Sequence, residues 1–190
     1  MHWPKSALAF LMAGSLAAAL VPASAAAQQA DTQQASTLQA TGQQTDEQFL
    51  TRFVGKWKGS GFVRTRTYRI AHPVNCSVRG KTSSDKLDLN GTCTAYLVFT
   101  RDIGANLALK PDGSYSGVYI GAKKGPSQLA GKRSDNTITL TVTWPKKING
   151  DRTATLKISN DSGGMHLEIW DRDKKSGDMV RTAALTFHKD

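Results

Sequence analysis

The stretch FVGKWKGSGFVRTR, residues 53–66, decides the fold because its side chains alternate strictly between two kinds. Successive side chains of an extended strand point to opposite faces, so every second residue shares a face. One face carries apolar or very small residues, Phe53, Gly55, Trp57, Gly59, Gly61 and Val63. The other carries polar and basic residues, Lys56, Lys58, Ser60, Arg64 and Arg66. The stretch therefore predicts a strand with its apolar face toward a core and its basic face toward water.

The rest of the chain repeats this alternation in short segments. The longest run covers residues 87–99, and residues 137–144 set four threonines against four apolar side chains. Turn signals such as PDG at 111–113 and NG at 149–150 separate the segments. Residues 103–106 fit either a helical turn or the start of a strand. The best helix candidate in the domain is a single turn at about residues 45–53.

Eight to ten short strands at roughly ten-residue spacing, joined by tight turns, predict an all-β protein. An antiparallel up-and-down barrel made of one sheet is the expected architecture, and a two-sheet sandwich is the alternative. Small barrels are either filled by their own side chains or hold one small ligand. The inward faces mix Gly and Ala with large apolar residues, so the sequence leaves both states open.

The N-terminal part has the layout of an export signal. Residues 1–27 place Lys5 before an apolar run, and the small residues at 23–27 suit a signal peptidase. The run is too short for a membrane span, and no second long apolar run follows. Residues 28–48 carry too little apolar surface to fold and are expected to form a disordered leader. Residues 49–190 remain for one barrel domain of a periplasmic or secreted protein that does not span a membrane.

The two cysteines, Cys76 and Cys93, both lie in the part of the chain expected to be exported. In an oxidising compartment such a pair is expected to form a disulfide rather than a metal or redox site. If Ser84 and Asp85 form a turn, Cys76 lies directly opposite Cys93 in an antiparallel hairpin. Both cysteines then fall on the apolar faces of their strands. Closing this loop would stabilise the fold by roughly 3 kcal/mol.

The domain is strongly basic. Of the 25 Lys and Arg only Lys5 precedes residue 52, and of the 15 Asp and Glu three do, so the domain carries about +12. Such a field favours an anionic envelope component, an acidic lipid or an acidic protein partner. The charges are spread over most strands, so a solvated surface explains them equally well. Nucleic acid is disfavoured by the export signal, and we expect a monomer.

The first strand also carries a family resemblance. The sequence Gly55-Lys56-Trp57 resembles the Gly-x-Trp signature of the calycins, which include lipocalins and fatty-acid-binding proteins, and GKWKGSG at 55–61 is similar to the first strand of nitrobindin-like haem-binding barrels. In calycins a basic residue of the last strand packs over the first-strand tryptophan and closes the barrel end. The resemblance therefore implies that Arg181 stacks over Trp57. The long helix beside lipocalin barrels and the lid helices of fatty-acid-binding proteins have no counterpart here.

Tryptophans and basic residues supply the candidate ligand-binding side chains, although tryptophans in a core need no function. A groove lined by Trp144 and Trp170, with Arg172 nearby, is one arrangement that would bind a glycan or acyl chain. The full set of candidates is Trp57, Trp144, Lys146, Lys147 and Arg181.

Haem would need an axial ligand, usually His. His72 stands beside Pro73 in a break between strands, and His166 and His188 are out of phase with the apolar faces of their strands. The sequence therefore predicts no cofactor, and haem is a minor alternative.

Catalytic signatures are not evident. The sequence shows no G-x-S-x-G motif, phosphate-binding loop, metal-ligand cluster or pair of buried carboxylates. Glu168 is expected to point outward, and most aspartates sit in or near turns, where they are favoured for local hydrogen bonding. We expect a non-enzymatic, calycin-like binding protein for a small hydrophobic or amphipathic molecule with an anionic group. The alternative is a cell-envelope interaction or inhibitor protein with a filled barrel.

Overall fold

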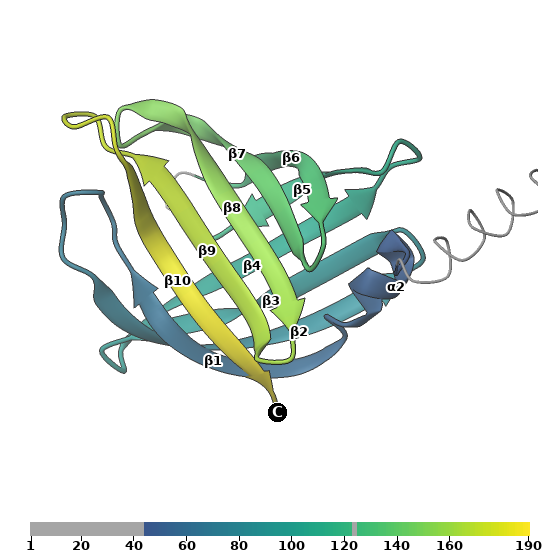
Figure 1. Cartoon of the computed structure of the whole chain (residues 1–190). Coiled ribbons are helices and arrows are strands. Elements are labelled where there is room, and N and C mark those ends of the chain that lie inside the picture. Colours follow the sequence, from purple (N-terminus) through teal and green to yellow (C-terminus); the bar gives the residue numbers. More distant parts are fainter. Residues whose placement is uncertain (1–43, 123–124) are drawn as a thin grey trace, which may run out of the picture. The chain divides into compact units, whose positions relative to one another are not determined.

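The computed structural model, which describes residues 44–122 and 125–190, shows one closed barrel of ten antiparallel strands in those residues (Figure 1). Each strand pairs with its neighbours in sequence, and β1 closes the sheet by pairing with β10. A short helix, α2 (Asp46–Thr51), precedes β1. The strands are β1 (Gly55–Val63), β2 (His72–Ser83), β3 (Lys86–Ala95), β4 (Phe99–Leu109), β5 (Ser114–Ile120), β6 (Ser127–Ser134), β7 (Thr137–Ile148), β8 (Asp151–Asp161), β9 (Gly164–Arg172) and β10 (Met179–Lys189).

This architecture confirms the expected all-β up-and-down barrel and rules out the two-sheet sandwich. The alternation of apolar and polar side chains explains why the sheet closes around a core. In β7 the inward residues, such as Ile138 and Leu140, are fully buried, while the threonines between them face out. Strand β1 follows the same rule, with Trp57 buried and Lys56 and Lys58 exposed. Within the described residues, no helix has the length and apolar character needed to cross a membrane.

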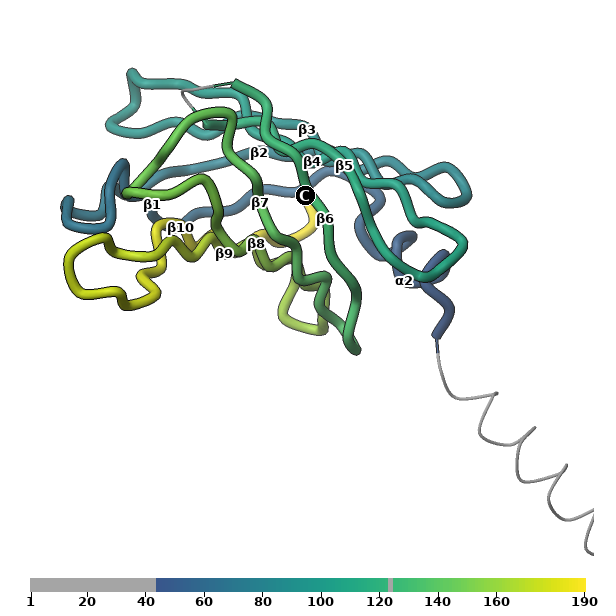
Figure 2. The backbone as a smooth tube through the Cα atoms, turned by 90° about the horizontal axis from the view of Figure 1, so that it is seen from above, coloured from purple at the N-terminus to yellow at the C-terminus, as the bar shows by residue number. Residues whose placement is uncertain are grey.

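The ends of the barrel differ. Helix α2 and the turns at 84–85, 110–113, 135–136 and 162–163 lie at one end, which we call the closed end. The β1–β2, β3–β4, β5–β6, β7–β8 and β9–β10 connections lie at the other, the open end. Figure 2 shows α2 on the opposite side of the barrel from the β1–β2 loop.

Helix α2 plugs the closed end. Phe49, Leu50 and Phe53 are fully buried there, and Thr45 and Gln48 form a capping box at the helix start. The helical turn expected at about 45–53 is therefore confirmed. The helix begins at Asp46, so the ordered domain starts before residue 49, because Phe49 and Leu50 give this turn apolar surface to bury. The expected export signal at 1–27 and residues 28–43 of the expected leader lie outside the described residues.

Two local expectations change in β3 and β4. The run 87–99 is not one strand, because Tyr96 and Leu97 form a hairpin tip between β3 and β4. Residues 103–106, left open between helix and strand, lie within β4. The tip contains no Gly, Pro, Asn or Asp, so the sequence offered no turn signal at this point.

Small residues on the inward face of β1 allow the barrel to close. A Cβ at Gly61 would lie 1.9 Å from the carbonyl oxygen of Ala184, and one at Gly59 would lie 2.3 Å from the carbonyl oxygen of Thr186 and 2.6 Å from the Phe187 ring. Glycine is therefore required at both positions for the close approach of β1 and β10.

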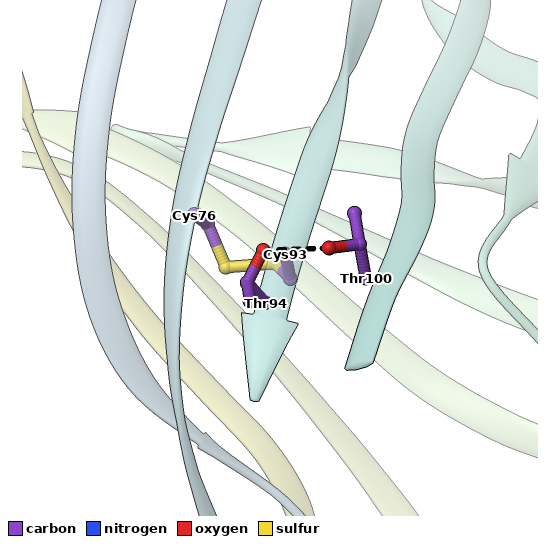
Figure 3. The surroundings of a disulfide bond; sticks show 4 residues. All are labelled: Cys76, Cys93, Thr94 and Thr100. Carbon is purple, nitrogen blue, oxygen red and sulfur yellow. Dashed lines mark hydrogen bonds between the residues drawn. A yellow bond between two sulfur atoms is a disulfide. The ribbon is translucent and has the colours of Figure 1, made fainter. Parts of the chain in front are cut away.

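The disulfide joins β2 to β3, as the cysteine pairing predicts. Cys76 lies directly opposite Cys93 in the register, their Cα atoms are 4.0 Å apart and their sulfurs are bonded. Figure 3 shows the bridge beside the hydrogen bond between the Thr94 and Thr100 hydroxyls, 3.0 Å apart, which links β3 to β4. The two interactions hold the open-end halves of three neighbouring strands together.

Reducing the Cys76–Cys93 bond should lower the free energy of unfolding by about 3 kcal/mol, because the bridge closes a loop between residues 17 apart in sequence. Urea unfolding of the oxidised and reduced protein would measure the difference. The double variant Cys76→Ala, Cys93→Ala should be destabilised under both conditions alike. Equal midpoints for oxidised and reduced wild type would contradict the expectation.

Candidate functional site

A cavity of about 820 Å³ opens at the open end of the barrel and reaches inward as far as Met165 and Phe187. Its wall is mostly apolar, and the deeper residues come from several strands, for example Val78, Leu89, Ala105, Met165, Leu185 and Phe187. The barrel is therefore hollow, with room for a small ligand. The mixed inward faces of the sequence had left both a filled and a hollow barrel open. Cavities of this size and composition suit small apolar or amphipathic ligands.

Basic side chains surround the mouth of this cavity. Arg64, Arg66 and Arg69 come from the β1–β2 loop, Arg101 from β4 and Lys147 from the end of β7. Arg101 faces inward because it lies opposite Cys93 in the β3–β4 register, and Cys93 also lines the cavity. An anionic group at the mouth would therefore meet several positive charges within a Debye length.

Polar groups also line the wall inside the mouth. The rings of Tyr119 and Trp144 meet edge to face with centroids 6.0 Å apart, and Asp171 on β9 lies on the same wall. Within residues 44–122 and 125–190, the Trp144 indole nitrogen and Asp171 Oδ1 are buried without a hydrogen-bond partner. The Trp144 and Asp171 side chains still interact, since Trp144 favours the charged form of Asp171, so the contact between them falls short of a well-formed hydrogen bond and a polar group of a ligand could compete for either atom.

The carboxyl of Asp171 is almost inaccessible, with 3% of the residue exposed. Burial raises its pKa, against the opposing effect of the Thr182, Asn149 and Trp144 side chains, which favour the charged form. Thr182 donates a hydrogen bond from its hydroxyl to Oδ2 of Asp171. Burial, aided by the Asp171 charge and opposed by Arg101, raises the pKa of Tyr119 to about 12, so its hydroxyl keeps its proton at neutral pH.

The candidate residues chosen from the sequence divide into two groups. Trp144 and Lys147 line the cavity, while Lys146 is exposed and does not. Trp57 lies at the closed end, where it donates a hydrogen bond from Nε1 to the carbonyl of Phe53, 2.9 Å away. It is therefore separated from the cavity, and Gly55 begins the same strand.

The expected stacking of Arg181 over Trp57 is wrong. Lys189 takes that place, with Nζ 5.4 Å from the indole centroid and its Cα opposite that of Trp57 in the register. A basic residue of the last strand does cover the first-strand tryptophan, but it lies eight positions later than the resemblance implied.

Arg181 lies instead on the outer face near the open end. A β-bulge between Arg181 and Ala183 adds one residue to β10, which reverses the alternation before it. The guanidinium lies 5.6 Å from the Phe62 ring centroid and 5.7 Å from that of Trp170. It also donates to Glu168, 2.6 Å away, which confirms that Glu168 points outward.

Three cavity residues escaped the sequence-based choice, although a signal existed for each. Tyr119 shares the inward face of Tyr115, and Asp171 continues the inward series of Met165, Leu167 and Ile169. Arg101 lies two residues beyond Phe99, in phase with the apolar face of the run 87–99. Strict alternation continued to the strand ends would have found all three.

Fold and site together define, within the described residues, a closed antiparallel ten-strand barrel with a cavity whose mouth is basic. No protein-family model and no curated protein matches the chain. Among solved structures, the chain is similar to the crystal structure of Rv2717c from M. tuberculosis, with a TM-score of 0.58 and 14% sequence identity. The match covers 75% of this chain and 96% of that one, and at this identity it supports the fold alone.

Because the Asp171 carboxyl is buried, we expect the effect of Asp171→Asn on the free energy of unfolding to depend on pH. The pKa of Asp171 in the folded protein lies above its usual value of 3.8. Ionising the carboxyl therefore opposes folding as the pH rises from 3.8 through the folded-state pKa. The variant should therefore be more stable than wild type at neutral pH, and the difference should shrink as the pH falls toward 3.8.

Urea unfolding at a series of pH values would test this, with the exposed Asp102→Asn as the control. A variant that is less stable than wild type at neutral pH would show that the Asp171 charge is compensated.

Proposed function

We propose that this protein is a non-enzymatic binding protein that holds a small amphipathic molecule, with the apolar part in the barrel and an anionic group at the mouth. The observation that carries this proposal is the apolar cavity of about 820 Å³ whose mouth is ringed by arginines. The similarity of the fold to calycin-like barrels supports it, since barrels of this size have room for one small ligand.

The two parts of the ligand would be recognised differently. Each methylene group moved from water into the apolar wall contributes about 0.8 kcal/mol, so chain length would dominate affinity. The guanidinium of Arg101 would contact the anionic group. The Trp144 indole N–H and Asp171 Oδ1, which lack well-formed hydrogen bonds, would select ligands with a polar group deeper along the chain.

Export to the periplasm or the exterior is part of the proposal. The Cys76–Cys93 bond supports it, because such bonds persist in oxidising compartments. Fractionation of cells producing the full chain would test the location.

Haem is a second candidate ligand, favoured by one specific observation. His72, rather than His166 or His188, lines the cavity, and its Nδ1 is 2.7 Å from the Tyr96 hydroxyl, a contact that would orient the ring. His72 would be the axial ligand and the mouth arginines would face the propionates. A Soret band that appears with haemin and is lost in His72→Ala would support haem, and its absence would reject it.

Filling the cavity should abolish ligand binding. Ala183 lines the cavity, and its neighbour Ala184 pairs with Glu168 on the outer face. Ala183→Phe should therefore weaken binding of dodecanoate at least about tenfold, while the matched control Ala184→Phe should leave it unchanged. Titration of tryptophan fluorescence would measure both, and mass spectrometry of protein purified without detergent would identify a natural ligand.

Equal binding by Ala183→Phe and Ala184→Phe would place the ligand elsewhere. A barrel that takes up no amphiphile and carries none after purification would favour the alternative of an envelope interaction or inhibitor protein.

Arg101, at the mouth of the cavity, should favour ligands with a negatively charged group. Arg101→Ala should weaken dodecanoate binding about fivefold and leave dodecanol binding unchanged, because only the carboxylate gains from the guanidinium. The control is Arg79→Ala, an exposed arginine on β2 that does not line the cavity. The loss should diminish at high salt, and equal losses for dodecanoate and dodecanol would contradict the role in charge selection.

A further inference from the structure

Large apolar side chains stand exposed around the mouth of the cavity. The β3–β4 tip presents Leu97 with 91% of its surface exposed and Phe99 with 70%, and the β1–β2 loop presents Ile70 with 72%. We call the whole set the apolar rim; its members are Tyr68, Ile70, Tyr96, Leu97, Val98 and Phe99. Figures 1 and 2 place both connections at the end of the barrel away from α2.

The β3–β4 tip adopts a backbone conformation that its residues disfavour. Tyr96 and Leu97 have φ of 50° and 62°, and the Val98 N–H donates to the Ala95 carbonyl, 3.3 Å away, as in a type I′ turn. Such turns are normally made by Asn-Gly, because a left-handed backbone brings the Cβ of a bulky residue too close to the following carbonyl oxygen. The other non-glycine residues of positive φ are small or polar, namely Ser84, Asp135 and Asn149.

Stability of the isolated fold does not explain this choice of residues. The tip side chains are exposed, so they bury little apolar surface in the barrel, while the turn they form would be better made by Asn-Gly. Strain of this kind, together with several large apolar side chains exposed on two connections at one end of the barrel, is typical of a surface that contacts something else.

The rim is also held in place. Tyr96 contacts His72 at the base of the β1–β2 loop through its hydroxyl. On the other side of that loop, the buried Thr67 donates to Asp173, 2.6 Å away, on the β9–β10 loop. Arg64 donates to the carbonyl of Arg69, 2.9 Å away, within the loop. The exposed side chains are therefore presented on fixed supports at two separated points.

The charges around the rim indicate the partner. Residues 64–71 contain Arg64, Arg66 and Arg69 and no acidic residue, and Arg101 and Lys147 lie on the same mouth. The acidic side chain next to the β3–β4 tip is Asp102. Aromatic and aliphatic side chains that project beyond a basic belt match an anionic lipid interface, where the apolar tips enter the acyl boundary and the arginines meet the phosphates.

We propose that the apolar rim docks the protein on an anionic lipid bilayer, with the mouth of the cavity facing the membrane. Two projecting connections at the mouth of a cavity fit a deformable bilayer better than a flat protein partner, which would need about 800 Å² of continuous contact. This inference goes beyond ligand binding and does not depend on what the cavity holds.

The test is flotation of the full chain with vesicles of phosphatidylcholine alone or in an equimolar mixture with phosphatidylglycerol. Wild type should bind the mixed vesicles, release them at high salt and bind phosphatidylcholine weakly. The double variant Tyr96→Asn, Leu97→Gly restores the preferred turn sequence and should leave urea stability unchanged or raise it. Its vesicle affinity should nevertheless fall at least about tenfold, because the apolar tip is gone.

The matched control is Val54→Asn, which removes an exposed apolar side chain near the closed end and should bind like wild type. Equal vesicle binding by wild type and the Tyr96→Asn, Leu97→Gly variant would overturn the proposal. The proposal would also be overturned if wild type does not bind vesicles and sediments as a dimer while the double variant is a monomer. That result would assign the rim to contact with a second copy of the chain. Ala183→Phe should still bind vesicles, so failure of ligand binding and failure of docking are separable.

Discussion

The pairing of β1 with β10 is the interaction on which the rest of the structure depends. It turns an open meander into a tube, and it requires backbone atoms of the two strands to approach more closely than a side chain would permit. Gly59 and Gly61 meet that requirement where Phe187 and the Ala184 carbonyl press against β1. The same two glycines belong to the stretch GKWKGSG that resembles the first strand of nitrobindin-like barrels, so part of that resemblance is a physical condition for closure.

The closed barrel has two ends, and their packing differs. The aromatic residues of α2 and β1 fill one end, with Arg133 and the Tyr115 hydroxyl donating to Asp46 to hold the helix in place. At the other end the wall encloses a cavity and includes the polar groups of Tyr119, Trp144 and Asp171. The plugged end is thus closed by apolar packing, while the opposite end, held by the disulfide, carries incompletely paired polar atoms and exposed apolar tips.

Sequence alone could predict the fold, because period-two alternation and turn residues report strand faces directly. It also located the disulfide, since a two-residue turn at 84–85 fixes the pairing of Cys76 with Cys93. It failed where the backbone departs from regularity without a sequence signal. The bulge after Arg181 moves that side chain outside, and the Tyr96-Leu97 tip hides a turn inside an apolar run. Both irregularities lie at the open end, so the candidate site was harder to predict than the core.

The plugged end also receives the C-terminus. Asp190 pairs with Lys58, 2.8 Å apart, and its N–H donates to the Lys56 carbonyl, while Gln44 lies just before α2 at the same end. A dye, affinity handle or solid support attached beyond Asp190 would therefore sit a barrel length away from the opening. An immobilised layer of the protein would present every opening to the bulk solution, which makes the chain suitable for oriented coupling to a sensor surface.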